Sequence, residues 1–112
     1  MVNLIKKIKN KKKIFFKNSN IKRNFIHVED VSKIICKIIN VKLEGIYNIS
    51  SDDQTNFSKL FQYLNKKYDV NIKYKKGKKE YLILSNNLIK KKIKNLKFIK
   101  INKIIDRIYK YN

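Results

Sequence analysis

Four residues of types that are rare in this chain lie close together near its first quarter. They are Arg23, one of two arginines, His27, the only histidine, and Glu29 and Asp30, two of eight acidic residues. A guanidinium carries a rigid fork of donors that matches phosphate oxygens, so Arg23 is a candidate phosphate contact. The alternative is an ordinary surface arginine that pairs with a nearby acid.

The other three residues have simpler structural explanations. His27 invites a role as general base because an imidazole titrates near neutral pH. Its position in the β-prone run 24–28 favours instead a histidine that fills a strand position. Glu29 and Asp30 are explained as an N-cap and a first-turn acid, both favourable at the start of a helix. We therefore expect no catalytic group among these three residues.

Hydrophobic periodicity predicts the elements that must position Arg23. Helices are expected at residues 2–9, 30–40, 57–68, 87–94 and 102–111. Strands are expected at residues 13–16, 24–28, 46–50, 71–74 and 81–84. The segment 17–20 is expected to be a turn whose asparagines adopt left-handed backbone, and 52–56 a polar loop that ends in an Asn56 cap.

Strands and helices therefore alternate along a chain of 112 residues, which has room for one domain. The amphipathic stripe of helix 57–68 is expected to be core rather than a platform for stacking. We predict a single region, 1–112, of α/β class, or α+β as an isolated piece.

The net charge of +21 suggests nucleic acid or an anionic membrane surface as a partner. The composition argues against both, because 27 of the 29 basic residues are lysine while Asn (15) and Ile (20) are also in excess. A bias toward A/T-rich codons explains all three excesses, whereas selection for phosphate binding would also have favoured arginine. Such charge opposes compaction, so the sequence leaves open that the chain alone is only marginally folded.

Cellular location is indicated by what the sequence lacks. A single cysteine, Cys36, permits no disulfide within the chain and no metal cluster. Apolar runs are only a few residues long, so no membrane span is expected, and the basic N-terminal stretch has no apolar segment typical of a secretory signal. We expect a cytoplasmic protein. A basic amphipathic surface helix at residues 2–9 is a weaker alternative.

Two motifs in order carry a resemblance to a known family. The segment "RNFIHVEDVSKII", which begins at Arg23, is followed at a suitable distance by "EGIYNISSDDQTNFSKLFQYL", which begins at Glu44. Together they resemble the C-terminal part of the NAD-dependent epimerase/dehydratase family, the extended short-chain dehydrogenases that act on nucleotide sugars. The resemblance covers nearly the whole chain. Departures include Asn18, Ser19 and Asn20 where the family has glycines, Asn24 in place of Asp, and Ser50 in place of Gly.

The resemblance implies a substrate role for a few residues of this chain. In the family the arginine that matches Arg23 reaches the substrate diphosphate. A second basic contact often precedes the later helix, where Lys76, Lys78 and Lys79 are available; we name Lys78 and Lys79 as candidates. The implied ligand is a nucleotide-diphosphate sugar.

The family's reaction also needs parts that are absent from the sequence. These are a Gly-rich turn that binds the pyrophosphate of NAD(P) and a Tyr-x-x-x-Lys pair that moves a proton. The chain has only Gly45 and Gly77, so we expect it to bind no cofactor alone and to lack catalytic residues. It would be a truncated or split epimerase/dehydratase that depends on a separate Rossmann-domain chain.

One pair mimics the catalytic motif. Tyr63 and Lys67 have the required spacing on a helix, but they follow the "YNIS" segment rather than precede it. Lysine is so abundant that chance produces such pairs, and Tyr74 and Lys78 form another. We expect Tyr63 to lie at the core edge and Lys67 to be solvated. The alternative function, from a different class, is a small lysine-rich module that binds nucleic acid.

Overall fold

The computed structural model describes residues 1–111 and is an α/β chain of five helices and five short strands in that range. The helices are α1 (Val2–Lys9), α2 (Val28–Asn40), α3 (Phe57–Tyr68), α4 (Asn87–Lys92) and α5 (Ile101–Tyr111). The strands are β1 (Ile14–Phe16), β2 (Ile21–Asn24), β3 (Gln54–Asn56), β4 (Ile72–Tyr74) and β5 (Glu80–Leu82). The fold class predicted from the sequence is confirmed.

The strands form two small sheets. In one, β1 pairs in parallel with β4, so that Phe15 lies opposite Lys73. In the other, β2 is central, antiparallel to β3 and parallel to β5. Arg23 therefore lies opposite Thr55 on one side and Leu82 on the other. The two neighbours of β2 come from segments about 30 and 60 residues later in the chain.

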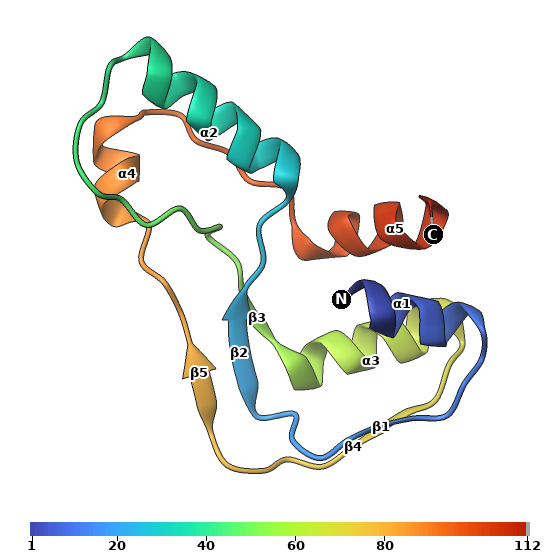
Figure 1. Ribbon diagram of the computed structural model, residues 1–112. Helices are drawn as coiled ribbons and strands as arrows, with labels where there is room; N and C mark the ends of the chain where they lie inside the picture. Colours follow the sequence, from blue (N-terminus) through green and yellow to red (C-terminus); the bar gives the residue numbers. More distant parts are fainter. Residues whose placement is uncertain (112) are drawn as a thin grey trace.

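The main core lies among α1, α3 and α5 and the inner face of the β1–β4 sheet (Figure 1). Its eight buried residues are Ile5, Ile8, Ile14, Leu60, Phe61, Leu64, Ile72 and Ile105. The Phe61 ring stacks on Phe16 with centroids 4.4 Å apart. Helix α3 begins where expected, because the Asn56 Oδ1 accepts a hydrogen bond from the Lys59 backbone N–H at 3.2 Å.

A second, smaller core lies between α2 and α4, at the upper left of Figure 1. Its buried residues are Ile34, Ile89 and Ile93. The buried carboxylate of Asp30 joins this lobe to the segment before α5, since its Oδ2 accepts from the Ile99 N–H at 2.7 Å. The β3–β2–β5 sheet lies between the two lobes (Figure 1).

The molecule is flat and extended. Its principal dimensions are 48 × 33 × 18 Å and its radius of gyration is 16.3 Å. A compact domain of this length would have a radius of gyration of about 13 Å. A thickness of 18 Å leaves room for little more than one helix packed on one sheet. Much of the apolar surface is therefore reachable from outside.

The strand expected at 24–28 lies earlier in the chain, at Ile21–Asn24. The β-prone residues after Asn24 instead lead into α2, whose N-cap is His27. The His27 Nδ1 accepts a hydrogen bond from the Glu29 backbone N–H at 3.1 Å. The expectation that His27 fills a strand position is wrong, and so is the assignment of the N-cap to the acids, which lie in the first turn.

The segment 46–50, expected to be a strand, forms none, and Ile46 is 96% exposed. A strand exists only with a partner, and no neighbouring strand lies beside this segment in the part of the chain described. Conversely, the expected loop 52–56 contains β3, because Gln54, Thr55 and Asn56 find a partner in β2. Composition alone did not reveal either outcome.

The turn 17–20 is stabilised by side chains rather than by left-handed backbone. Its asparagines have ordinary negative φ, and the positive-φ residues other than glycine lie elsewhere in the described chain, Lys11 and Asp69 among them. The Asn18 Oδ1 accepts from the backbone N–H groups of Asn20 and Gly77, both at 2.9 Å, and its Nδ2 donates to the Lys78 carbonyl at 2.7 Å. This turn connects the two sheets.

Candidate functional site

Arg23 lies in the central strand of the three-stranded sheet, and hydrogen bonds hold its guanidinium against that sheet. Its Nη1 donates to the carbonyl oxygens of Lys22 and Glu80, each at 2.8 Å. The group therefore bridges β2 and β5. One terminal nitrogen makes both of these bonds, which leaves donors on the other nitrogens for a ligand.

Arg23 lines a pocket of about 220 Å³ at the edge of the sheet. The apolar part of its wall is formed by Ile26, Ile49, Leu82 and Leu84. A charged group beside apolar walls interacts with an anion more strongly than it would in open water. Sites that enclose a whole small-molecule ligand commonly have volumes of about 300 to 1,000 Å³. At about 220 Å³, this pocket lies below that range.

The guanidinium is not neutralised by an acid. The three ion pairs found within residues 1–111 are Lys67–Asp106, Lys90–Asp52 and Arg107–Glu29. The other arginine, Arg107, thus pairs with Glu29 at 3.0 Å and lowers the pKa of that carboxyl. The ordinary alternative for Arg23, an ion pair with a nearby acid, is not found in the described chain.

Asn24 fixes the backbone beside Arg23. Its Nδ2 donates to the carbonyl oxygens of Ser51 and Asp53, at 3.1 and 3.2 Å, and its Oδ1 accepts from the Leu84 N–H at 2.8 Å. An asparagine can do both because its amide carries a donor and an acceptor. In the sequence, Asn24 stands out only as a departure from the Asp of the epimerase/dehydratase family that the chain resembles. Here the amide has a structural use of its own.

A second polar group continues this network. The Asn86 Nδ2 donates to the Ser50 carbonyl at 3.0 Å and to the Asp52 Oδ1 at 2.9 Å. The hydrogen bond from Asn86, with help from the Lys90 ammonium, lowers the pKa of Asp52. This contact positions the loop after residue 50 against the start of α4. Asn86 was missed by sequence reasoning, because no local pattern marks a contact to a residue 36 positions away.

The lysines named as second basic contacts do not join Arg23. The Lys79 Nζ lies 4.6 Å from the centre of the Tyr81 ring, and the Lys22 Nζ lies 4.8 Å from it. Lys22 and Arg23 are adjacent in β2, so their side chains leave opposite faces of the sheet. Lys79 thus shares a face with Lys22 rather than with Arg23. Lys78 is exposed, and its carbonyl accepts from Asn18.

Tyr63 and Lys67 both contact the same acid, Asp106. The Asp106 Oδ1 accepts from Lys67 at 2.6 Å, from Tyr68 at 2.8 Å and from Tyr63 at 3.3 Å. The contact with Asp106 raises the pKa of Lys67, while burial and the same carboxylate raise the pKa of Tyr68. The charge of Lys67 lowers the pKa of Tyr68, but burial and the carboxylate outweigh it. The cluster joins α3 to α5.

The glycines do not form a cradle for a nicotinamide cofactor. Gly45 has φ of +117°, and a Cβ there would meet the Tyr47 ring at 3.2 Å. Gly77 lies between β4 and β5, against Asn18. Neither glycine opens directly into a helix, which the pyrophosphate of such a cofactor needs. The residues present therefore do not fit this group.

Among residues 1–111, no group of three or more His, Cys, Asp and Glu side chains could hold a metal ion. Across the same residues, each helix is too short or too polar to cross a bilayer.

Comparison with known proteins reveals a structural likeness. No protein-family model and no curated protein matches the chain. Among solved structures, the fold is similar to the crystal structure of a "putative epimerase" from Burkholderia cenocepacia J2315, with a TM-score of 0.79 at 16% sequence identity. The match covers 97% of this chain and 40% of the Burkholderia chain. The chain shares that fold over nearly its whole length and spans less than half of the larger protein.

Proposed function

We propose that this chain is the substrate-side portion of an NAD-dependent nucleotide-sugar epimerase or dehydratase and that Arg23 contacts the substrate diphosphate. The observation that carries the proposal is the Arg23 guanidinium, which lines a partly apolar pocket and has no acidic partner in the described chain. The likeness to the Burkholderia fold supports it coarsely. Lys78 and Lys79 remain candidate contacts of lesser weight.

The chemistry suits a diphosphate. A guanidinium binds two phosphate oxygens at once, and its hydrogen bonds to the Lys22 and Glu80 carbonyls orient it before the ligand arrives. Because the side chain is already ordered, little rotamer freedom is lost on binding. A lysine at this position would supply the charge without the planar geometry.

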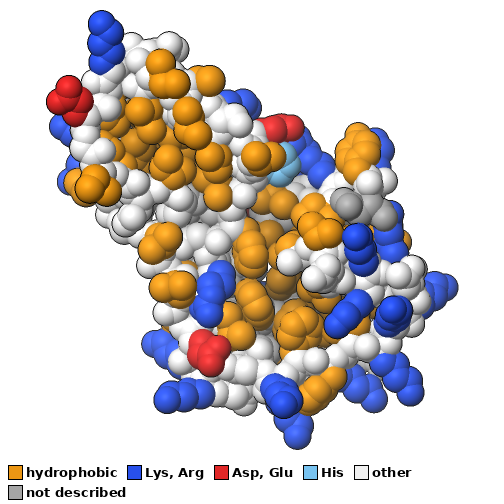
Figure 2. Space-filling view, in the orientation of Figure 1, with side chains coloured by type: hydrophobic (Ala, Val, Ile, Leu, Met, Phe, Trp, Pro, Cys, Tyr) orange, Lys and Arg blue, Asp and Glu red, His pale blue; other side chains and the backbone are white. Residues whose placement is uncertain are grey.

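Catalysis would require a Rossmann half on another chain or segment, which would bring NAD(P). Two features support such a partner. The first is a set of exposed large apolar side chains on α2, on the segment after it and on α4. They are Ile35, Ile39, Val41, Ile46 and Leu88. Figure 2 shows apolar side chains gathered over this lobe. Segment 46–50, which pairs with no strand in the described chain, is also available to join a neighbouring sheet.

Calorimetric titration with a nucleoside-diphosphate sugar tests the proposal. Arg23→Ala should weaken binding by roughly 1.5 to 3 kcal/mol, the value of a hydrogen bond to a charged group. The matched control is Arg107→Ala, which removes the other arginine and the same charge at a site paired with Glu29. If the two substitutions weaken binding equally, or if Arg23→Ala has no effect, Arg23 does not contact the ligand.

A further inference from the structure

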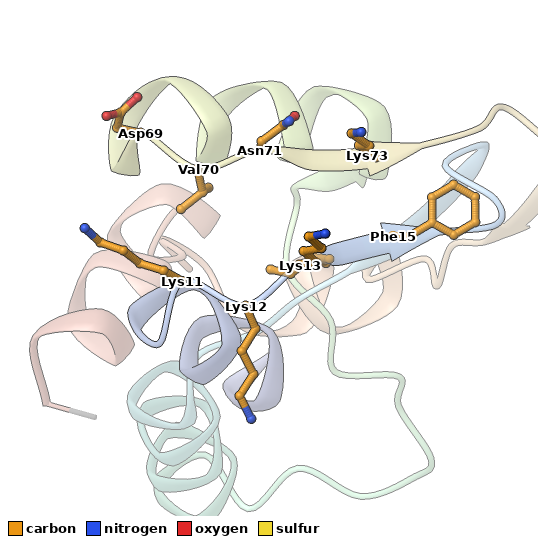
Figure 3. A pocket seen from close by; sticks show the side chains of 9 residues that line it. Lys11, Lys12, Lys13, Phe15, Asp69, Val70, Asn71 and Lys73 are labelled. Carbon is orange, nitrogen blue, oxygen red and sulfur yellow. The ribbon is translucent and has the colours of Figure 1, made fainter.

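An open groove of about 510 Å³ lies beside the outer face of the two-stranded β1–β4 sheet (Figure 3). It shares no lining residue with the Arg23 pocket. Its basic wall is formed by Lys11, Lys12, Lys13 and Lys73, and the acid Asp69 also lines it. The groove is independent of the function proposed above.

The backbone explains why these side chains meet. Lys11 has φ of +50°, a left-handed conformation that ends α1 and turns the chain into β1. Ile14 and Ile72 are buried on the inner face of the sheet, so alternation places the side chains of Lys13, Phe15 and Lys73 on the outer face. Phe15 and Lys73 are direct partners across the strands.

The charge of the groove is not compensated. Four lysines face one carboxylate, and none of these five side chains takes part in an ion pair within residues 1–111. Lysine makes up about a quarter of the chain, so a lysine cluster alone does not single out a site. A second feature of a different kind is needed.

That feature is Phe15. Phe15 is 56% exposed and lines the groove, where it lies at one end of the residues labelled in Figure 3, near Lys13 and Lys73. The other exposed aromatic rings of the described chain, Tyr81 and Tyr111, each have a lysine ammonium over the ring, at 4.6 and 5.3 Å. The ring of Phe15 makes no such contact and no contact with another ring. A flat apolar ring that is open to solvent within a basic groove is a surface on which a nucleic-acid base can stack.

We propose that this groove binds single-stranded nucleic acid, with a base stacked on Phe15 and phosphates on the surrounding lysines. Single strands are bound in this way because every base has a flat face and the backbone follows a positive groove. In Figure 3 the four lysine side chains do not converge on one point: Lys11 and Lys12 point in different directions, and Lys13 and Lys73 lie closer to Phe15. This spread fits successive phosphates of a strand better than the phosphates of one free nucleotide.

Fluorescence anisotropy with a labelled 12-nucleotide single strand, at about 0.1 M salt, tests the proposal on the full chain. Replacing Phe15 with Leu should weaken binding roughly 5- to 100-fold with little change in salt dependence. The double substitution Lys13→Gln, Lys73→Gln should weaken binding and lower the salt slope by about 1.4, or about 0.7 for each lost phosphate contact. Arg23→Ala should leave this binding unchanged, which separates it from the nucleotide-sugar site.

Matched variants distinguish binding at this groove from nonspecific attraction of the strand to the positive charge of the whole chain. Lys91→Gln with Lys92→Gln removes the same charge from exposed positions of α4, in the other lobe. Tyr111→Leu removes another exposed ring. The proposal is overturned if these controls weaken binding as much as the groove variants do. It also fails if polyphosphate of equal charge displaces the strand regardless of Phe15, or if free ATP binds as tightly as the strand.

Discussion

The Arg23 guanidinium donates to the Glu80 carbonyl oxygen at 2.8 Å, so the residue proposed to hold the ligand also joins β2 to β5. The two residues are 57 positions apart in the chain. Strands of only four and three residues gain little from their own hydrogen bonds, and a charged donor between them adds to the sheet. Arg23 therefore has a structural role that any binding experiment has to separate from recognition.

Replacing Arg23 with Ala should lower the free energy of unfolding by about 1 to 2 kcal/mol, because the Lys22 and Glu80 carbonyls lose a charged donor. Urea denaturation followed by circular dichroism measures this change. Arg23→Lys should recover part of the stability, since an ammonium reaches one of the two carbonyls. An unchanged midpoint for Arg23→Ala would mean that these bonds add nothing in solution.

Asn24→Asp restores the residue typical of the resembled family and should nevertheless destabilise this chain, by about 1 to 3 kcal/mol. The carboxylate cannot donate to Ser51 and Asp53, and it would face their carbonyl oxygens. Thermal unfolding at neutral pH gives the comparison. The control is Asn71→Asp, which adds the same charge at an exposed position. A stability equal to that of the control would contradict the hydrogen-bond network.

Gly77→Ala should cost about 1 to 3 kcal/mol through overpacking. A Cβ at this position would lie 3.0 Å from the Asn18 Cγ and Oδ1. Asn18 cannot move aside easily, because its amide is held by Asn20, Gly77 and Lys78. In a double-mutant cycle with Asn18→Ala, the cost of Gly77→Ala should largely disappear. Additive effects of the two substitutions would place the strain elsewhere.

Stability should fall in acid partly through Asp106. The hydrogen bond from Lys67 lowers the pKa of Asp106 below its usual range, and Tyr68 adds to the effect. A carboxyl whose pKa is lower in the folded state stabilises the fold above its unfolded pKa of about 3.9, and this contribution is lost as the pH falls further. Melting temperatures of the parent chain and Asp106→Asn between about pH 2 and pH 6 should converge at the acid end. A constant difference across that range would rule out this titration.

Local features of the sequence predicted the helices well. For α3 the Asn56 cap and the stripe of Phe57, Leu60 and Leu64 are adjacent in the chain, and its bounds are as predicted. The strands were harder, because β2 is defined by partners at 54–56 and 80–82. Residues 46–50 have strand composition and no partner, so composition overestimated their order.

The candidate site shows the same difference between local sequence features and contacts between distant segments. Arg23 stood out by its rarity and by its place in a motif, which are properties of the sequence. Its contact with Glu80, the amide network of Asn24 and the separation of Lys79 onto the other face depend on pairing between distant segments. No local spacing encodes such contacts, and only the folded chain reveals them.

The unequal size of the two cores has a consequence for how the chain opens. Eight buried residues hold α1, α3 and α5 with the first sheet, whereas three isoleucines hold α2 against α4. Local opening costs least where least apolar surface is buried, so the amide hydrogens of α2 and α4 exchange with solvent before those of α3. A protease that samples transient openings would meet the α2 lobe first, and a protein that covers its exposed isoleucines would slow that encounter.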